Sequence, residues 1–189
     1  FKIKNTKYFK DKSFFDIEMS LPNKKKTILK KFEIPLIGSH NIKNATAAIA
    51  ISYFIGIPLS ILKKSLKNFK GVQRRFNFLF KKNDALFIDD YAHHPTEISS
   101  VLEGVKEVYK KKEIICIFQP HRISRVKNLK FEFSRSFKKA DTVILCPIYK
   151  ASENIKLGFA YEKFAKLIIK NSNVSLLKFE NEDSLKKLV

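Results

Sequence analysis

Two aspartates, a tyrosine and two histidines fall within one seven-residue stretch of the chain, 89–95 (DDYAHHP). A short apolar run precedes this stretch, and apolar residues at the i, i+3, i+4, i+7 spacing of an amphipathic helix follow it. We therefore expect a strand-to-helix turn, in which Pro95 suits the first helical position because no hydrogen bond is lost there. In an open α/β sheet such turns lie at the carboxyl ends of strands, where ligands bind.

These residue types allow two kinds of ligand. Carboxylates and imidazoles both bind divalent metal ions, so the aspartates and histidines together are one candidate metal site. Their spacing matches no closed zinc motif, however, and adjacent residues of an extended segment point to opposite faces. We therefore favour a nucleotide: Asp90 is expected to accept hydrogen bonds from ribose hydroxyls, as acidic residues do at the switch points of α/β sheets. His94 and Pro95 are expected to start the helix.

Arginine is rare in this chain and falls in two tight groups. Only five of the 38 basic residues are arginine, and four of these form the pairs Arg74/Arg75 and Arg122/Arg125. A guanidinium group binds carboxylate or phosphate through paired hydrogen bonds, which a lysine ammonium cannot do. Arg122 and Arg125, three residues apart at a helix start, can hold one anion between them. Arg75 lies in a linker, where an arginine is most often solvated but can also reach a transferring phosphoryl group.

A third polar group, formed by His40, Asn41 and Asn44, opens a helix that is rich in alanine. Asparagine is a good helix cap, and capping alone explains Asn41. The functional alternative is that the two side-chain amides and the imidazole bind the edge of a purine. The residues by themselves leave both interpretations open.

The net charge of +20 comes mainly from lysines spread along the whole chain. Such a charge attracts anionic partners, nucleic acid among them. A nucleic-acid-binding module needs a localised basic stripe or stacking aromatic residues, whereas the aromatic residues here lie mostly in apolar runs. We therefore favour a solvated surface with no nucleic-acid partner. Cys116 and Cys146 lack a CxxC partner, which predicts reduced thiols in a cytoplasmic protein. No apolar run has transmembrane length, so no membrane partner is expected.

The pattern of secondary structure changes near residue 72. Antiparallel strands and two helices are predicted before it, at 14–19, 31–36, 42–54 and 59–69. After it we predict hairpin strands at 76–80 and 85–89, helices at 95–109, 126–138, 159–170 and 182–188, and strands at 114–118, 142–146 and 174–177. The runs 114–118 and 142–146 are apolar on both alternating faces, as in parallel strands covered on both sides. This is an α/β chain, which we divide into domains at 1–72 and 73–189.

The predicted topology brings chemically active residues together. Right-handed crossovers place the turns after residues 89, 118 and 146 on one edge of the parallel sheet. The segments on this edge are 90–94, 119–125 and 147–154, and they contain three of the four histidines, two of the five arginines and Glu153. This convergence is the strongest argument from the residues alone for an active site.

Four motifs, in this order along the chain, resemble those of the Mur ligase family. They are 38–45 (GSHNIKNA), 71–76 (GVQRRF), 89–97 (DDYAHHPTE) and 118–125 (FQPHRISR). The resemblance runs through nearly the whole chain and implies a Rossmann-like C-terminal domain with a mostly parallel sheet. This domain would occupy 73–189 and be incomplete at its end. Residues 1–72, which precede this domain, would form the end of a central ATPase domain that binds ATP.

The resemblance also implies a reaction and a role for each candidate residue. Members of the family form amide bonds with ATP and Mg2+ through an acyl phosphate. The branch that these motifs most resemble joins L-alanine to UDP-N-acetylmuramate in peptidoglycan synthesis. The implied adenine contacts are His40, Asn41 and Asn44. Asp90 would hold the ribose, and Arg75 would approach the γ-phosphate. The amino acid and the activated carboxylate would be bound by Tyr91, His93, Arg122 and Arg125. The candidate catalytic residues are Arg75 and His93.

The chain also departs from the family pattern. It contains no GxxxxGK[ST] phosphate loop. No metal ligand is assigned to it, because the family's magnesium ligands and UDP-sugar domain precede the matching region. Ser39 stands where the family usually has a basic residue, and 149–153 (YKASE) matches only loosely the pattern around Glu153. We therefore expect no ligase activity from the chain without the missing N-terminal and central regions of the same enzyme.

Three other functions compete with this one. A murein-peptide-recycling ligase of the same family has a similar C-terminal domain, although Tyr91 and Glu97 favour the alanine-adding branch. A basic nucleic-acid-binding module belongs to a different class and is suggested by the charge alone. The third is a regulatory or structural domain that keeps the fold without the chemistry.

Overall fold

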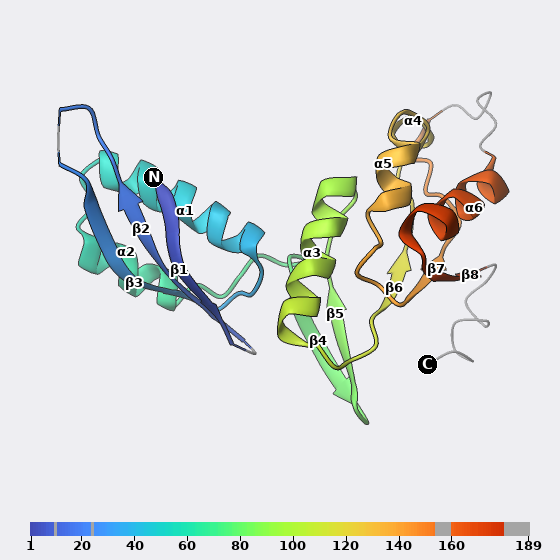
Figure 1. Ribbon diagram of the computed structural model, residues 1–189, viewed down its shortest axis with the longest axis horizontal. Helices are drawn as coiled ribbons and strands as arrows, with labels where there is room; N and C mark the ends of the chain where they lie inside the picture. Colours follow the sequence, from blue (N-terminus) through green and yellow to red (C-terminus); the bar gives the residue numbers. More distant parts are fainter. Residues whose placement is uncertain (10, 24, 154–159, 180–189) are drawn as a thin grey trace. The chain divides into compact units, whose positions relative to one another are not determined.

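The computed structural model describes residues 1–9, 11–23, 25–153 and 160–179 (Figure 1). The chain divides into two compact units. The first unit comprises Phe1–Tyr91 with Glu107–Lys110, and the second comprises Ala92–Lys106 with Lys111–Val189. No helix in the described parts of the chain is both long and apolar enough to cross a membrane.

The first unit is built on an antiparallel sheet of three strands, β1 (Lys2–Tyr8), β2 (Ser13–Met19) and β3 (Thr27–Ile34). The helices α1 (Ser39–Phe54) and α2 (Leu59–Lys67) cover one face of it (Figure 1). Every second residue of β2 is buried, and Phe15 stacks on Phe32 with ring centroids 5.6 Å apart. Both predicted strands and both predicted helices are confirmed. β1 was not predicted, because most of its residues are exposed and show no apolar alternation.

The predicted hairpin is present between β4 (Asn77–Lys82) and β5 (Ala85–Asp89). Asn83 begins its turn with a φ of 52°, a left-handed conformation that asparagine tolerates in hairpins. Among the described strands, β5 pairs only with β4. The crossover argument that placed the turn after residue 89 on the edge of the parallel sheet treated β5 as a strand of that sheet, and this part of the prediction was wrong. An apolar run shows that a strand can be buried, but not which strand it pairs with.

The second unit surrounds a parallel sheet in the order β6-β7-β8. The strands are β6 (Ile115–Phe118), β7 (Thr142–Leu145) and β8 (Ser175–Lys178). The helices are α3 (Pro95–Val108), α4 (Ile123–Asn128), α5 (Lys130–Arg135) and α6 (Tyr161–Ser172). The core joins Leu102 of α3, Phe133 of α5 and Ile168 of α6 with β7. The predicted α/β class with a parallel sheet is confirmed.

Burial differs between the centre and the edge of this sheet. Three successive residues of β7, Val143 to Leu145, are buried, so this strand is covered on both faces as predicted. Ile115 and Ile117 of β6 are 54% and 48% exposed, so the same prediction was wrong for β6. The predicted helix 126–138 is divided at Leu129 into α4 and α5. The predicted helix 182–188 lies outside the described residues.

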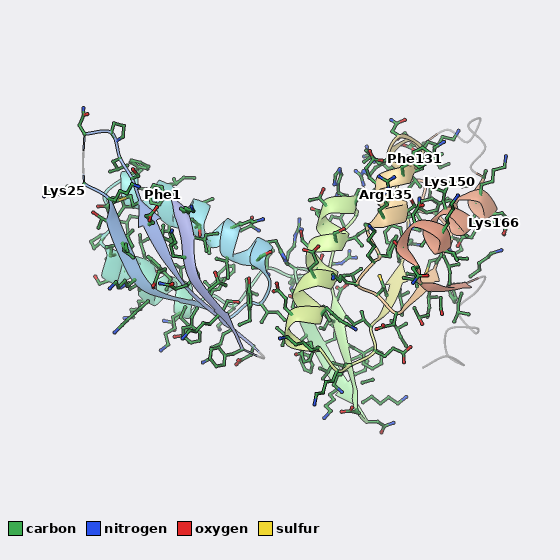
Figure 2. All side chains as sticks on the ribbon, viewed as in Figure 1. Phe1, Lys25, Phe131, Arg135, Lys150 and Lys166 are labelled. Atoms are coloured by element: carbon green, nitrogen blue, oxygen red, sulfur yellow. The ribbon has the colours of Figure 1, made fainter. Side chains whose placement is uncertain are left out.

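Lysine side chains project from both units. Lys25 of the first unit and Lys150 and Lys166 of the second are exposed examples (Figure 2). Within the described residues, the buried polar side chains are serine, threonine and asparagine, and none carries a charge. The positive charge of the chain is therefore distributed over its surface, where the desolvation cost of an ammonium group is small.

Candidate active site

The start of α1 carries the first group of candidate residues. Gly38 precedes the helix with a φ of 95°, which favours glycine, and no side chain caps the helix. Asn41 is buried, and its Nδ2 donates a hydrogen bond to the Ile37 carbonyl at 2.8 Å. The capping interpretation of Asn41 was therefore wrong: its amide anchors the chain that enters the helix. His40 is half-buried and Asn44 exposed, four residues apart on one face of the helix.

The second group, which we call the linker site, consists of Arg74, Arg75, Asp89, Asp90 and Tyr91. Two hydrogen bonds hold its two segments together: the Tyr91 N–H donates to the Arg74 carbonyl at 2.7 Å, and the Phe76 N–H donates to Asp90 Oδ2 at 2.8 Å. The Arg74 guanidinium lies 4.9 Å from the centre of the Tyr91 ring, and its Nε is 3.5 Å from Asp89 Oδ2. The predicted ribose acceptor, Asp90, is thus fixed beside the arginine pair.

The local backbone explains how the linker site is formed. Arg74 and Phe76 both have positive φ, 56° and 55°, on either side of Arg75. Left-handed conformations cost non-glycine residues on the order of 1 kcal/mol each, so contacts must hold them. The carboxylate of Asp90 supplies one such contact by accepting from the Phe76 N–H. The side chain of Arg75 is exposed.

The two histidines of the DDYAHHP stretch lie at the start of α3. The N–H groups of His93 and His94 both donate to Glu97 Oε2, at 3.0 and 3.2 Å. A carboxylate is favourable at a helix N-terminus, where backbone donors lack partners within the helix. Pro95 begins the helix, as predicted. His93 Nδ1 also lies 3.7 Å from Glu97 Oε2, so the ring and this carboxylate are neighbours.

The third group, which we call the two-loop site, consists of His121, Arg122, Ser124, Arg125, Tyr149 and Glu153. The loops that follow β6 and β7 continue side by side beyond the ends of their strands. Cys146 N–H donates to the Phe118 carbonyl at 2.9 Å, Tyr149 N–H to Pro120 at 2.8 Å, and Arg122 N–H to Tyr149 at 2.8 Å. Of the three turns predicted to converge, those after residues 118 and 146 are therefore confirmed to do so.

Aromatic rings line one part of the two-loop site. The His121 ring centroid lies 5.2 Å from that of Tyr149 and 6.2 Å from that of His93. Desolvation by burial lowers the pKa of His121, and the positive charges of Arg125 and Arg122 lower it further. The imidazole is therefore neutral near pH 7. His121 was not among the predicted site residues, although its place between a strand end and an arginine pair was a visible signal.

The arginines of this site have different environments. Arg122 is exposed and precedes α4 with a φ of 67°, whereas Arg125 is half-buried. Arg125 Nη1 and His121 Nδ1 are both buried and have no hydrogen-bond partner among the described residues. Buried polar atoms in native proteins are almost always hydrogen-bonded, so such atoms in a cluster indicate a place for a ligand. A guanidinium beside a neutral imidazole suits an anion such as a carboxylate.

Glu153 lies at the far end of the two-loop site. Its Oε2 accepts a hydrogen bond from the Ser124 N–H at 3.0 Å, and its Oε1 accepts one from the Ser124 hydroxyl. These two hydrogen bonds are the main reason that the pKa of Glu153 is lowered, and the charge of Arg122 adds to them. The carboxylate is therefore ionised at neutral pH and binds the first turn of α4.

The described residues contain no group of three or more histidine, cysteine, aspartate and glutamate side chains that could hold a metal ion. Asp89 interacts with Arg74, and Asp90 with the Phe76 N–H. Cys116 and Cys146 are unpaired thiols. Burial raises the pKa of Cys116 to about 12, so it carries no thiolate at neutral pH.

The chain belongs to the Mur ligase family: residues 74–187 match the family's glutamate ligase domain. Over its whole length it is 59% identical to the UDP-N-acetylmuramate–L-alanine ligase of Pelagibacter ubique and spans 41% of that enzyme. The solved UDP-N-acetylmuramate-alanine ligase of Thermotoga maritima matches 99% of this chain with a TM-score of 0.72 and 25% identity, over 39% of its own length. A murein peptide ligase of Psychrobacter arcticus shares the fold, with a TM-score of 0.61 and 23% identity over 98% of this chain and 37% of that one.

These matches confirm the predicted family and fold. They also show that the chain spans about two fifths of the length of the curated relatives it matches.

Proposed function

We propose that this chain is the C-terminal part of an ATP-dependent ligase that joins L-alanine to UDP-N-acetylmuramate in peptidoglycan synthesis. The identity of 59% over all 189 residues to a ligase of that name supports the assignment. In the proposed domain organisation, residues 1–72 end the central ATP-binding domain and residues 73–189 form most of the C-terminal domain. The enzyme would act in the cytoplasm, where ATP and UDP-sugars are made.

The nucleotide would be held by the first unit. His40, Asn41 and Asn44 are proposed to contact the adenine, Asp90 the ribose and Arg75 the γ-phosphate. An ionised carboxylate only accepts hydrogen bonds and has several lone pairs, so Asp90 can bind the Phe76 N–H and ribose hydroxyls together. The exposed guanidinium of Arg75 is suited to stabilise charge on a phosphoryl group during its transfer.

The amino acid would be held by the two-loop site, with His93 and Tyr91. The observation that carries this proposal is that Arg125 Nη1 and His121 Nδ1 are buried without a partner among the described residues. A bound carboxylate would accept from Arg125, while the exposed Arg122 reaches the same anion or the acyl phosphate. His93, whose ring lies beside Glu97, would contact the reacting groups.

The proposed reaction consists of two transfers. The muramoyl carboxylate takes the γ-phosphoryl group of ATP, and ADP leaves. The L-alanine amine then attacks the acyl carbon, and the tetrahedral intermediate expels phosphate. Magnesium bound with ATP would neutralise phosphate charge, and its protein ligands are proposed to lie in other parts of the longer enzyme. The residues of this chain would contribute positioning and charge stabilisation.

Phosphate release by the full-length enzyme, measured with ATP and UDP-N-acetylmuramate, tests the proposal. We expect release to depend on L-alanine and not on a murein tripeptide offered as the incoming amine. Dependence on the tripeptide alone would transfer the assignment to a murein-peptide-recycling ligase. The isolated 189-residue chain is expected to release no phosphate under the same conditions, and measurable release would contradict this part of the proposal.

A further inference from the structure

The start of α4 lacks a cap from its own segment. The helix has only six residues, Ile123–Asn128, and the side chain of Arg122, which precedes it, makes no capping hydrogen bond. The first N–H groups of any helix have no partner within the helix and need one from elsewhere. Here the partner comes from the loop after β7: Glu153, 29 residues further along the chain, accepts from both the N–H and the hydroxyl of Ser124.

Glu153 is itself held in place by its loop. Ala151 and Ser152 have φ of 48° and 65°, two successive left-handed residues that reverse the chain just before Glu153. The Glu153 N–H closes this turn by donating to the Lys150 carbonyl at 3.1 Å. Such backbone conformations are unfavourable for residues other than glycine and persist where other contacts impose them. The turn therefore aims the Glu153 carboxylate back at α4.

Ser124 lies between the two arginines of the two-loop site. Its backbone position determines where the Cα atoms of Arg122 and Arg125 lie, and hence where their guanidinium groups can reach. We propose that Glu153 is a positioning residue for the incoming amino acid: by holding Ser124 it places Arg122 and Arg125, without contacting the substrate itself. This inference rests on the proposed function, because it assigns the arginines to the amino-acid carboxylate.

The alternative is that Glu153 binds the ammonium group of the amino acid directly. Two substitutions in the full-length enzyme separate these roles. In Glu153→Gln, the amide oxygen can still accept from the Ser124 N–H and the amide nitrogen can donate to the Ser124 hydroxyl, but the negative charge is lost. In Glu153→Ala, both hydrogen bonds are lost. If Glu153 only positions Ser124, loss of its negative charge should affect L-alanine binding much less than loss of its two hydrogen bonds.

We expect Glu153→Ala to raise the KM for L-alanine about 10-fold. Arg122 and Arg125 would remain in the site but would bind the amino acid less well because they are misplaced. The KM values for ATP and UDP-N-acetylmuramate should stay within about twofold, and Glu153→Gln should stay within about threefold of the unmodified enzyme for all three substrates. Ser124→Ala should raise the KM for L-alanine a few-fold, and the double variant Ser124→Ala/Glu153→Ala should be no worse than Glu153→Ala alone. The matched control is Glu132→Ala, which removes an exposed carboxylate from α5.

Three results would overturn the proposal. Equal damage from Glu153→Gln and Glu153→Ala would indicate direct contact with the ammonium group. A parallel rise in all three KM values would indicate a general structural role. An unchanged KM for L-alanine would exclude any role in this site. If Glu153→Ala does not fold, Ser124→Ala decides between the expected rise and no effect. Failure of the proposed function is distinct from all of these, because the unmodified enzyme would then show no L-alanine-dependent phosphate release.

Discussion

The two arginine pairs of this chain are built in different ways. In the linker site, Arg74 packs against the Tyr91 ring and lies near Asp89, while 61% of its side chain remains exposed. In the two-loop site, Arg125 is half-buried and one of its guanidinium nitrogens has no partner among the described residues. The linker arginine thus has charged and aromatic neighbours at an exposed position, whereas the two-loop arginine has a buried donor with no partner among the described residues.

This difference indicates how much each region depends on its arginines. An exposed ion pair or ring contact contributes little, because water competes with it. A buried donor without a partner destabilises the protein by about 1–3 kcal/mol, and this is recovered only when an acceptor binds. The two-loop site should therefore be sensitive to small changes in donor geometry, and the linker site should tolerate them.

The largest effect is expected for Arg125→Lys in the full-length enzyme. Lysine keeps the positive charge, but its ammonium lacks the planar pair of N–H donors of a guanidinium. One of the two donor positions is therefore left empty. We expect kcat/KM for L-alanine to fall about 100-fold, because a hydrogen bond to a charged group contributes about 1.5–3 kcal/mol. The assay is phosphate release at varied L-alanine.

The matched control is Arg135→Lys, which makes the same replacement at an exposed position of α5 (Figure 2). It should change kcat/KM less than twofold, as surface substitutions usually do. If Arg125→Lys were equally mild, the two-loop site would not depend on its arginine more strongly than the linker site does.

A smaller effect is expected for Asp90→Asn in the linker site. The asparagine oxygen can still accept from the Phe76 N–H, so the local backbone should be retained. Loss of charge-assisted hydrogen bonds to the ribose should raise the KM for ATP about 10-fold, and the KM for L-alanine should not change. Asp89→Asn is the matched control, with an expected change below about twofold because its partner Arg74 is exposed. Equal effects of the two substitutions would remove the distinction between Asp89 and Asp90.

Much of the fold followed from local patterns, and the exceptions are instructive. The helices α1, α3 and α6 have strong apolar periodicity or propensity, and β7 is apolar on both faces, so all four were predictable. The exposed face of β6 and the pairing of β5 depend on which elements lie beside these strands. The local sequence pattern does not determine those neighbours.

The site shows the same division. Arg122, Arg125 and Asp90 could be selected because arginine is rare in the chain and aspartate suits its turn. The bonds from Ser124 to Glu153 and the ring contacts of His121 could not be predicted. They depend on the register of two parallel loops whose residues lie nearly 30 positions apart. A motif names residues, but the pairing of loops decides which of them touch.

The pH dependence of stability should reveal the lowered pKa of His121. Burial lowers the pKa of His121, so between that value and about 6.5 the unfolded chain binds more protons than the folded one. The stabilising contribution of neutral His121 is therefore complete above about pH 6.5 and is lost as the pH falls below it. We expect His121→Gln to flatten the decline of the melting temperature between pH 7.5 and 5.5. A decline of the same slope in His121→Gln and in the unmodified protein would contradict this contribution of His121.

The smallest effect concerns the contact of Arg74 with Tyr91. At an exposed position a guanidinium 4.9 Å from a ring centre should contribute only about 0.5 kcal/mol to the free energy of unfolding. A double-mutant cycle with Arg74→Gln and Tyr91→Leu, measured by urea denaturation, isolates this pairwise term from the nearby Asp89. A matched cycle uses Lys12 and Phe14 of the same unit, where Lys12 Nζ lies 5.8 Å from the centre of the Phe14 ring. Its expected coupling is smaller. A coupling well above 1 kcal/mol for Arg74 and Tyr91 would mean that the linker site is as tightly built as the two-loop site. The contrast between the linker site and the two-loop site would then fail.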